Sequence, residues 1–250
     1  MKIPVSVAII TKNEEKNIEK LLESVRDFQE IVVVDSFSTD NTVEICKKYT
    51  DKVYQKDWEG FARQKQFAIE KTTLSWILVV DADERVTEEL KKEILEKISS
   101  ENFDGYYIPR KNFFLGRWIK YSGWWPDYTL RLFRRQKGRL QMRQVHEKII
   151  VEGKVGYLKN SLLHYTYSSV SEFITKMQNY STLSAEEIIK NNSKNYKIVL
   201  KMIFSPIFTF IKMFILRFGF LDGTKGFLLA VLYSYYTFLK YAKAWERLCR

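Results

Sequence analysis

Two aspartates separated by one residue, Asp81 and Asp83, directly follow an apolar run that ends at Val80. Carboxylates at this spacing repel each other unless a cation or hydrogen-bond donors lie between them. A hard divalent cation commonly binds one or two carboxylates together with phosphate oxygens of a substrate. The pair therefore indicates a site for a metal-bound phosphate. An Asp-x-Asp sequence alone is common, so this interpretation depends on the elements around it.

Two other polar clusters follow apolar runs in the first half of the chain, at residues 11–15 (Thr-Lys-Asn-Glu-Glu) and 35–40 (Asp-Ser-Phe-Ser-Thr-Asp). Each cluster has a structural alternative. Thr11 and Glu14 have the spacing of a capping box, and Ser38, Thr39 and Asp40 are ordinary N-cap residues. Considered singly, these residues fit a structural role as well as a functional one.

The elements that must carry these clusters alternate between strands and helices. Continuous apolar runs predict buried strands at 5–10, 31–34 and 76–80, and a short strand is expected at 52–54. Helices are expected at 13–27, where apolar residues recur at a spacing of three or four, and at 40–50, 60–71 and 87–100. This alternation predicts an α/β fold with right-handed crossovers and a mostly parallel sheet flanked by helices. Ligands of such sheets bind beyond the carboxyl ends of the strands, where all three polar clusters fall.

Several enzyme classes are disfavoured by motifs that do not occur. No Gly-x-Gly-x-x-Gly follows the first apolar run, and no Gly-rich loop with Lys-Ser/Thr is present. This pattern argues against a dinucleotide-dependent oxidoreductase and a P-loop NTPase. A sugar-phosphate nucleotidyltransferase is disfavoured in the same way, because it normally needs a Gly-rich phosphate loop near the N-terminus.

The net charge of +11 is divided unevenly along the 250 residues. Residues 1–100 carry 16 basic and 20 acidic side chains, whereas residues 101–250 carry 25 basic and 10 acidic ones. An acidic first part and a strongly basic second part argue against one uniform nucleic-acid-binding surface. The division predicts two parts with different partners.

The three clusters together resemble family 2 glycosyltransferases of the GT-A fold. The resemblance rests on Thr11-Lys12-Asn13-Glu14-Glu15, on Val32-Val33-Val34-Asp35-Ser36 and on Val79-Val80-Asp81-Ala82-Asp83-Glu84. It implies that the first two clusters hold the nucleotide of a nucleotide-sugar and that the Asp-x-Asp pair holds a divalent metal, Mg²⁺ or Mn²⁺, on the diphosphate. By this resemblance, Thr11 and Glu14 line the nucleoside pocket, Asp35 accepts from the base, Asp81 lies near the ribose or the metal, and Asp83 is a metal ligand. The expected donor-binding residues are Thr11, Asn13, Glu14, Asp35, Ser36, Lys65, Asp81 and Arg131.

Two of these residues have competing interpretations. Lys65 could equally belong to a solvated helix face, and Arg131, in Arg-Leu-Phe-Arg-Arg, could belong to a general basic face together with Arg134. Otherwise Arg131 and Arg134 are candidates for phosphate contacts, on the donor or on an anionic acceptor.

The catalytic assignments fall in the middle of the chain. The resemblance implies a late histidine as an additional metal ligand, and His164, one of only two histidines, is expected at the end of a strand. Sugar transfer with inversion also needs a general base for the acceptor hydroxyl. Glu147 in Val-His-Glu is the expected base, with Asp127 in Trp-Pro-Asp-Tyr as the alternative. The commoner form of this motif is Glu-Asp, from which the chain departs.

The last part of the chain predicts association with a membrane. Residues 198–216 form an apolar run of 19 residues in which only Lys201 and Lys212 are charged. On a helix, these lysines share one stripe with Ser205 and Thr209, and the rest of the circumference is apolar. Such a helix can lie in the membrane interface or pack its apolar face on the protein. A full span ranks below both, because a central lysine facing lipid costs about 2.5–3.5 kcal/mol.

A second apolar run at 226–239 ends with Lys240, Lys243 and Arg247. Two such helices in a basic background suit an anionic bilayer surface. We therefore expect a glycosyltransferase domain at 1–165, with a nucleotide-sugar half at 1–100 and an acceptor half at 101–165. A helical membrane-associating region is expected at 166–250.

The C-terminal sequence resembles one subgroup of the family. Arg217-Phe218-Gly219-Phe220-Leu221-Asp222-Gly223 and Lys240-Tyr241-Ala242-Lys243-Ala244-Trp245-Glu246 are similar to lipopolysaccharide core β-1,4-glucosyltransferases. The resemblance implies transfer of glucose from a UDP-sugar to an anionic glycolipid, peripherally at the cytoplasmic face of the bacterial inner membrane. Another cell-envelope or exopolysaccharide acceptor is the alternative. Outside enzymes, the chain could be a basic membrane- or nucleic-acid-binding protein without catalysis.

Overall fold

The computed structural model describes residues 2–100, 102–141, 148–190 and 195–249. The chain forms two compact units, one of Met1–Arg110 with Asp127–His164 and the other of Lys111–Pro126 with Tyr165–Arg250. Residues 111–126 therefore join the C-terminal helices. The predicted functional division at residue 165 remains a prediction.

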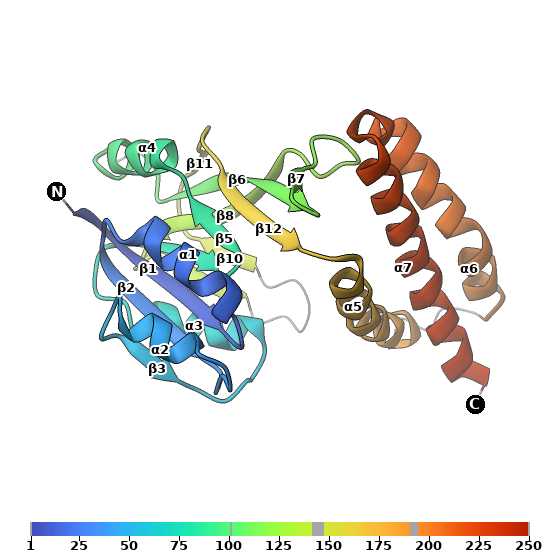
Figure 1. Cartoon of the computed structure of the whole chain (residues 1–250), viewed down its shortest axis with the longest axis horizontal. Coiled ribbons are helices and arrows are strands. Elements are labelled where there is room, and N and C mark those ends of the chain that lie inside the picture. The colour runs from blue at the N-terminus through green and yellow to red at the C-terminus, as the bar shows by residue number, and fades with distance from the viewer. Residues whose placement is uncertain (1, 101, 142–147, 191–194, 250) are drawn as a thin grey trace. The chain divides into compact units, whose positions relative to one another are not determined.

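A parallel sheet of four strands lies at the centre of the first unit. The strand order is β3-β2-β1-β4, and each neighbouring pair is parallel. The strands are β1 (Ile3–Thr11), β2 (Phe28–Asp35), β3 (Val53–Gln55) and β4 (Trp76–Asp81), and the helices between and after them are α1 (Glu15–Val25), α2 (Thr42–Lys47), α3 (Phe61–Glu70) and α4 (Glu88–Ile98) (Figure 1). The predicted α/β class with a mostly parallel sheet is confirmed.

Both faces of this sheet are buried, which explains why its strands read as unbroken apolar runs. Val7 and Ile9 of β1 pack in the core cluster that holds Leu21 of α1. Ala8 and Ile10 point to the other face, into the cluster that contains Ala68 and Ile69 of α3. Each fully buried side chain of the size of Leu21 contributes about 1.5–3 kcal/mol.

The sheet continues beyond β4 through strands that were not predicted in detail. The order after β4 is β8 (Asp127–Arg134), β6 (Gly105–Phe114), β12 (Leu162–Tyr167) and β5 (Glu84–Val86), and β8 runs antiparallel to both β4 and β6. Two short strands pair with β6, namely β7 (Arg117–Trp118) and β11 (Val155–Tyr157), and β9 (Gly138–Gln141) forms a separate hairpin with β10 (Lys148–Val151). In the described parts of residues 105–167, the strand pairs are thus mainly antiparallel.

The second unit contains three long helices and a tight turn. They are α5 (Val170–Lys190), α6 (Asn195–Phe210) with a π-helical continuation η1 (Ile211–Leu216), a 3₁₀ turn η2 (Gly219–Asp222) and α7 (Thr224–Cys249). α7 packs against both α5 and α6 (Figure 1). Among the described residues, the stretch Asn195–Leu216 is the one helical segment long and apolar enough to cross a membrane.

The turn between η1 and α7 is held by specific contacts within this unit. The buried Asp222 carboxylate accepts hydrogen bonds from the backbone N–H groups of Lys120 (3.2 Å) and Tyr121 (2.9 Å). A Cβ at Gly226 would come within 2.0 Å of the Gly219 carbonyl oxygen. The glycine and the aspartate of the C-terminal motif therefore form a close-packed structural turn.

Candidate active site at the carboxyl edge of the sheet

The polar clusters that follow β1, β2 and β4 lie at one edge of the sheet. Thr11 is in register with Asp35, and Ile10 is in register with Asp81. The carboxyl ends of three neighbouring parallel strands therefore meet, as the sequence predicts.

Asn13 and Glu14 join the first two loops to each other. The Asn13 N–H donates to Ser38 Oγ (2.8 Å), and its side-chain oxygen accepts from the Thr39 N–H (2.8 Å). The Glu14 N–H donates to Thr42 Oγ1 (2.8 Å). Asn13 has a φ of +54°, a left-handed conformation that asparagine tolerates better than most residues.

Thr11 does not form the capping box that its spacing allowed. The residue that caps α1 is Glu14, and α1 has no side-chain cap hydrogen bond. The Thr11 hydroxyl is buried and has no hydrogen-bond partner among the described residues. A buried hydroxyl without a partner is costly, so this atom is a candidate for bonding to a ligand or water.

Asp35 and Ser36 are buried at the end of β2. The Asp35 carboxylate accepts from the Ser38 N–H (2.8 Å) and from the Ser38 hydroxyl, which gives the following loop its shape. Ser36 Oγ accepts from the Gln64 side-chain amide (2.6 Å), and Gln64 is fully buried on α3. The sequence did not single out Gln64, although it lies directly before Lys65.

Asp81 lies between two cations. Its Oδ1 is 2.8 Å from Lys65 Nζ, and its Oδ2 pairs with Arg131 Nη2. Burial would raise the pKa of the Asp81 carboxyl, but Arg131 and Lys65 outweigh burial and hold that pKa well below its usual range. Lys65 and Arg131 are themselves buried, so the alternatives of a solvated helix face for Lys65 and a general basic face for Arg131 are wrong.

A further carboxylate extends this arrangement into a chain of alternating charges. Glu84 is fully buried, and its Oε1 accepts from Arg131 Nη2 (2.9 Å) and from Arg110 Nη1 (3.3 Å), while its Oε2 accepts from the Asp81 N–H (3.0 Å). Arg110 also donates to Asp127 Oδ2 through Nε (3.0 Å) and Nη2 (2.7 Å). Glu84 and Arg110 were not predicted; the only sequence signal is that Glu84 directly follows the Asp-x-Asp motif.

Asp83 and His164 come together although 80 residues separate them in the chain. β5 pairs antiparallel with β12, so that His164 is opposite Glu84, the residue after Asp83. His164 Nε2 lies 3.4 Å from Asp83 Oδ2, and both side chains are partly exposed. Ligand atoms on one octahedral Mg²⁺ are about 3 Å apart, because each lies about 2.1 Å from the ion.

These two side chains fit a divalent cation. An imidazole nitrogen and a carboxylate oxygen suit Mn²⁺, and the carboxylate suits Mg²⁺. The described residues contain no group of three or more such ligands, so water or substrate oxygens would have to complete the coordination. Both carboxylate oxygens of Asp81 are paired with the side chains of Lys65 and Arg131. This pairing favours Asp83 and His164 as the protein ligands of the metal.

Two other predicted residues are not part of the site as the structure describes it. Glu147 and the neighbouring His146 are outside the described residues. Arg134 is in register with Trp76 at the start of β4, with its guanidinium 4.9 Å from the Trp76 ring centroid. Arg134 is therefore at the opposite end of the strand from Asp81, so its predicted role in phosphate binding is wrong for a donor bound at the carboxyl edge.

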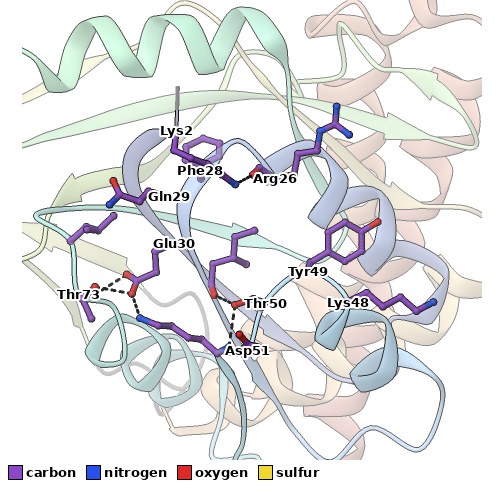
Figure 2. Close-up of a pocket in the computed structure, with 13 residues that line it drawn as sticks. Lys2, Arg26, Phe28, Gln29, Glu30, Lys48, Tyr49, Thr50, Asp51 and Thr73 are labelled. Carbon is purple, nitrogen blue, oxygen red and sulfur yellow. Dashed lines mark hydrogen bonds and ion pairs between the residues drawn. The ribbon is translucent and has the colours of Figure 1, made fainter.

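A cavity of about 600 Å³ opens at the amino edge of the same sheet (Figure 2). Its walls are the segments that precede or begin the strands, including Lys2, Phe28, Glu30 and Thr73. Glu30 is held there by hydrogen bonds from Thr73 and Lys52. Because it lies at the edge away from the strand ends that carry the polar clusters, this cavity is distinct from the candidate site.

Comparisons with known proteins agree with this fold. A family model described as Glycosyl transferase family 2 matches residues 6–166. The lipopolysaccharide core biosynthesis glycosyltransferase LpsC of Rhizobium meliloti is 35% identical over 98% of this chain and 93% of its own length. An uncharacterized glycosyltransferase of Rickettsia typhi, RT0209, is 30% identical over 97% of this chain and 87% of its own length.

Among solved structures, S. aureus TarS 1–349 in complex with UDP-GlcNAc matches with a TM-score of 0.51 and 18% identity, covering 100% of this chain and 92% of that one. At this identity the match shows the fold alone. The predicted fold class, a sheet of the GT-A type flanked by helices and followed by an apolar C-terminal helix, is confirmed.

Proposed function

The chain belongs to glycosyl transferase family 2, and we propose that it transfers a hexose, glucose in the first instance, from a UDP-sugar to a membrane glycolipid such as the lipopolysaccharide inner core. The family membership confirms the resemblance seen in the sequence. The acceptor is supported by the name of LpsC, and the UDP-sugar donor by the UDP-GlcNAc complex of TarS. A non-catalytic binding protein is disfavoured by the same membership.

One observation carries the proposal: Asp83 and His164 lie 3.4 Å apart at the carboxyl edge, beside the group formed by Lys65, Asp81 and Arg131. A divalent cation bound there would supply positive charge to the departing diphosphate. Asp81 would hold Lys65 and Arg131 in fixed positions around the donor. Hydrogen bonds through Glu84 and Arg110 connect this group to Asp127.

Binding of the nucleoside falls to the loops after β1 and β2. Asn13, Glu14, Asp35 and Ser36 shape these loops through the hydrogen bonds described above. The unpartnered hydroxyl of Thr11 is the atom best suited to a direct bond with the donor. We assign these residues to recognition of the nucleoside.

A general base must accept the proton of the attacking acceptor hydroxyl as the anomeric carbon is inverted. Glu147 remains the proposed base. Asp127 is the alternative, and its Oδ2 already accepts two hydrogen bonds from Arg110.

The acceptor side is proposed to operate at a membrane. Residues 101–250 carry the positive charge of the chain, and the second unit contains the exposed apolar helix. Both features suit an anionic glycolipid that stays in the bilayer, and peripheral attachment at the cytoplasmic face of the inner membrane follows from the proposed substrate. Another cell-envelope or exopolysaccharide acceptor is the alternative, and analysis of the product would distinguish the two.

The metal and donor assignments are tested together by Asp83→Ala and His164→Ala. We expect each to weaken Mn²⁺-dependent binding of UDP, measured by isothermal titration calorimetry, by at least about tenfold, because ligands and their supports affect metal binding on that scale. Asp51→Ala, at the amino edge, is the matched control and should bind as the unaltered protein does. Unchanged Mn²⁺-dependent binding in Asp83→Ala would contradict the assignment.

The base is tested by Glu147→Gln and Asp127→Asn. Glu147→Gln should bind UDP normally and lose sugar transfer, since a neutral amide cannot accept the proton. If Glu147→Gln transfers normally and Asp127→Asn does not, Asp127 is the base. Donor binding measured in parallel separates a catalytic defect from a folding defect.

A further inference from the structure

The helical segment Asn195–Leu216 exposes apolar side chains that a helix of a soluble protein would bury. Only 11% of its most apolar stretch is buried. Five side chains of α6 are 50–61% exposed and define what we call the outer face: Leu200, Ile203, Phe204, Ile207 and Phe208. At 100° per residue they fall within about 140° of arc, so they form one continuous surface. Ile215 and Leu216 of η1 are exposed as well (51% and 60%).

The opposite side of the same helix faces the protein. Ile198 and Met213 are buried there. Thr209 Oγ1 donates to Thr237 Oγ1 of α7 (3.3 Å), and Lys201 Nζ lies 6.0 Å from the Tyr241 ring of α7. Thr209 of the polar stripe is therefore next to α7, whereas Lys201 and Lys212 of the stripe are exposed. The apolar surface is left without a partner within the described residues.

The turn after this helix, and the helix α7 that packs beside it, are tied to polar parts of the same unit. At the turn that follows it, the Arg217 carbonyl accepts from the Ser122 N–H (2.9 Å), and Lys225 Nζ donates to the Leu115 carbonyl (2.7 Å). Near its other end, Lys243 of α7 donates to four oxygens of α5, including Gln178 Oε1 (2.8 Å). α5 carries charged residues along its length, from Glu172 to Lys190.

These contacts limit the orientations in which the helix can bind a membrane. A helix that crosses places its ends on opposite sides of about 30 Å of hydrocarbon. Here α7 and the charged α5 would have to follow, because α7 packs against both α5 and α6. An orientation parallel to the bilayer immerses the outer face and leaves every one of these polar groups on a single side.

The charged side chains near the outer face are all basic, which favours binding to anionic lipids. Lys197, Lys201, Lys212 and Arg217 are exposed along the segment, and no acidic residue occurs between Asn195 and Leu221. We infer that this segment lies in the plane of an anionic bilayer, with the outer face inserted into one leaflet and these cations at the headgroups. The inference deepens the membrane association proposed above, and it names the surface and the mode of attachment.

Binding of the purified full chain to vesicles tests the surface. The vesicles contain phosphatidylethanolamine and phosphatidylglycerol, with phosphatidylcholine vesicles for comparison, and no sugar or metal is added. The double variant Phe204→Glu with Ile207→Glu should reduce partitioning into the anionic vesicles at least about tenfold, because charged side chains in hydrocarbon are strongly disfavoured. Leu95→Glu, at a residue of α4 that is 40% exposed, is the matched control and should bind normally.

Two results would overturn the surface assignment. One is unchanged vesicle binding by the double variant. The other is a stable dimer of the unaltered chain that the double variant dissociates, with no vesicle binding, which would make the outer face a contact between copies. Asp83→Ala should bind vesicles normally, so failure of the donor-site proposal and failure of this inference give different results.

The in-plane orientation is tested by accessibility of cysteines at the two ends. Asn195→Cys and Leu221→Cys, each introduced with Cys249→Ser, are placed in inside-out inner-membrane vesicles and treated with a membrane-impermeant maleimide. Both residues are exposed in the structure, and Asn195 projects on the side of the helix opposite the outer face. Labelling of both supports the in-plane orientation. If only one of the two cysteines is labelled until the vesicles are permeabilised, the helix crosses the membrane and the in-plane orientation is overturned.

Discussion

Glu30 offers a quantitative test of the charge interactions in the first unit. It lies on β2 at the amino edge of the sheet, where Thr73 donates to it from its N–H and its hydroxyl, each at 2.8 Å (Figure 2). The Ser6 hydroxyl and the Lys52 ammonium also donate to it. Burial alone would raise the pKa of Glu30, but these donors, led by Lys52, lower it from 4.5 to about 2.

The lowered pKa converts into a pH-dependent contribution to stability. A decrease of about 2.5 in pKa corresponds to about 3.4 kcal/mol at 1.36 kcal/mol per pKa unit. Because the pKa is lower in the folded state, this contribution is present above about pH 4.5 and is lost as the pH falls from there towards 2. About 1.4 kcal/mol of it remains at pH 3.

We therefore expect Glu30→Gln to lower the free energy of unfolding by about 3 kcal/mol at pH 7 and by about 1 kcal/mol at pH 3. Urea unfolding followed by circular dichroism at both pH values measures the difference. Glu187→Gln, at an exposed residue of α5, is the control and should change stability by no more than about 0.5 kcal/mol. A loss in Glu30→Gln that is equal at the two pH values, or below about 1 kcal/mol at pH 7, would refute the role of the charge.

Three other substitutions test the packing around the site and the helical unit. Glu84→Gln removes the carboxylate charge that Arg110 and Arg131 share. The free energy of unfolding in urea should fall by about 3 kcal/mol or more, and UDP should bind more weakly. Glu88→Gln, at an exposed residue, is the control and should change neither the stability nor UDP binding. Asp222→Ala removes the acceptor of two backbone N–H groups and should cost about 2 kcal/mol or more, with Asp222→Asn less severe, as measured by thermal unfolding. Gly226→Ala should destabilise the same unit by about 1–3 kcal/mol, because its Cβ meets a carbonyl oxygen; an unchanged melting temperature would show that the turn is not close-packed.

The parallel half of the fold was predictable because its strands are buried on both faces. Burial on both faces requires an unbroken apolar run, and β1, β2 and β4 each contain one. The antiparallel strands from β5 onward were harder to predict. β6, for example, mixes buried Ile108 and Asn112 with partly exposed Arg110 and Phe113, so no simple period marks it.

The sequence predicted which residues belong to the candidate site better than it predicted which of them contact one another. Asp83 follows directly from the motif, and the carboxyl-edge rule places Thr11 and Asp35 near it. The proximity of His164 to Asp83 depends on the register between β5 and β12, which no local pattern encodes. Glu84 and Arg110 were missed for the same reason, because their partners lie on other strands.

The helix at residues 198–216 shows most clearly what the sequence determines and what only the tertiary structure determines. The sequence by itself determined that residues 198–216 form an apolar helix with one polar stripe, because helical geometry follows from local spacing. Only the tertiary structure decided which side faces outward, since that depends on what covers the helix. α7 covers the side with Ile198 and Thr209, and its tertiary contacts leave Phe204 and Ile207 exposed. Burial is a property of neighbours brought together from distant parts of the chain, so it cannot be calculated from the period of one segment.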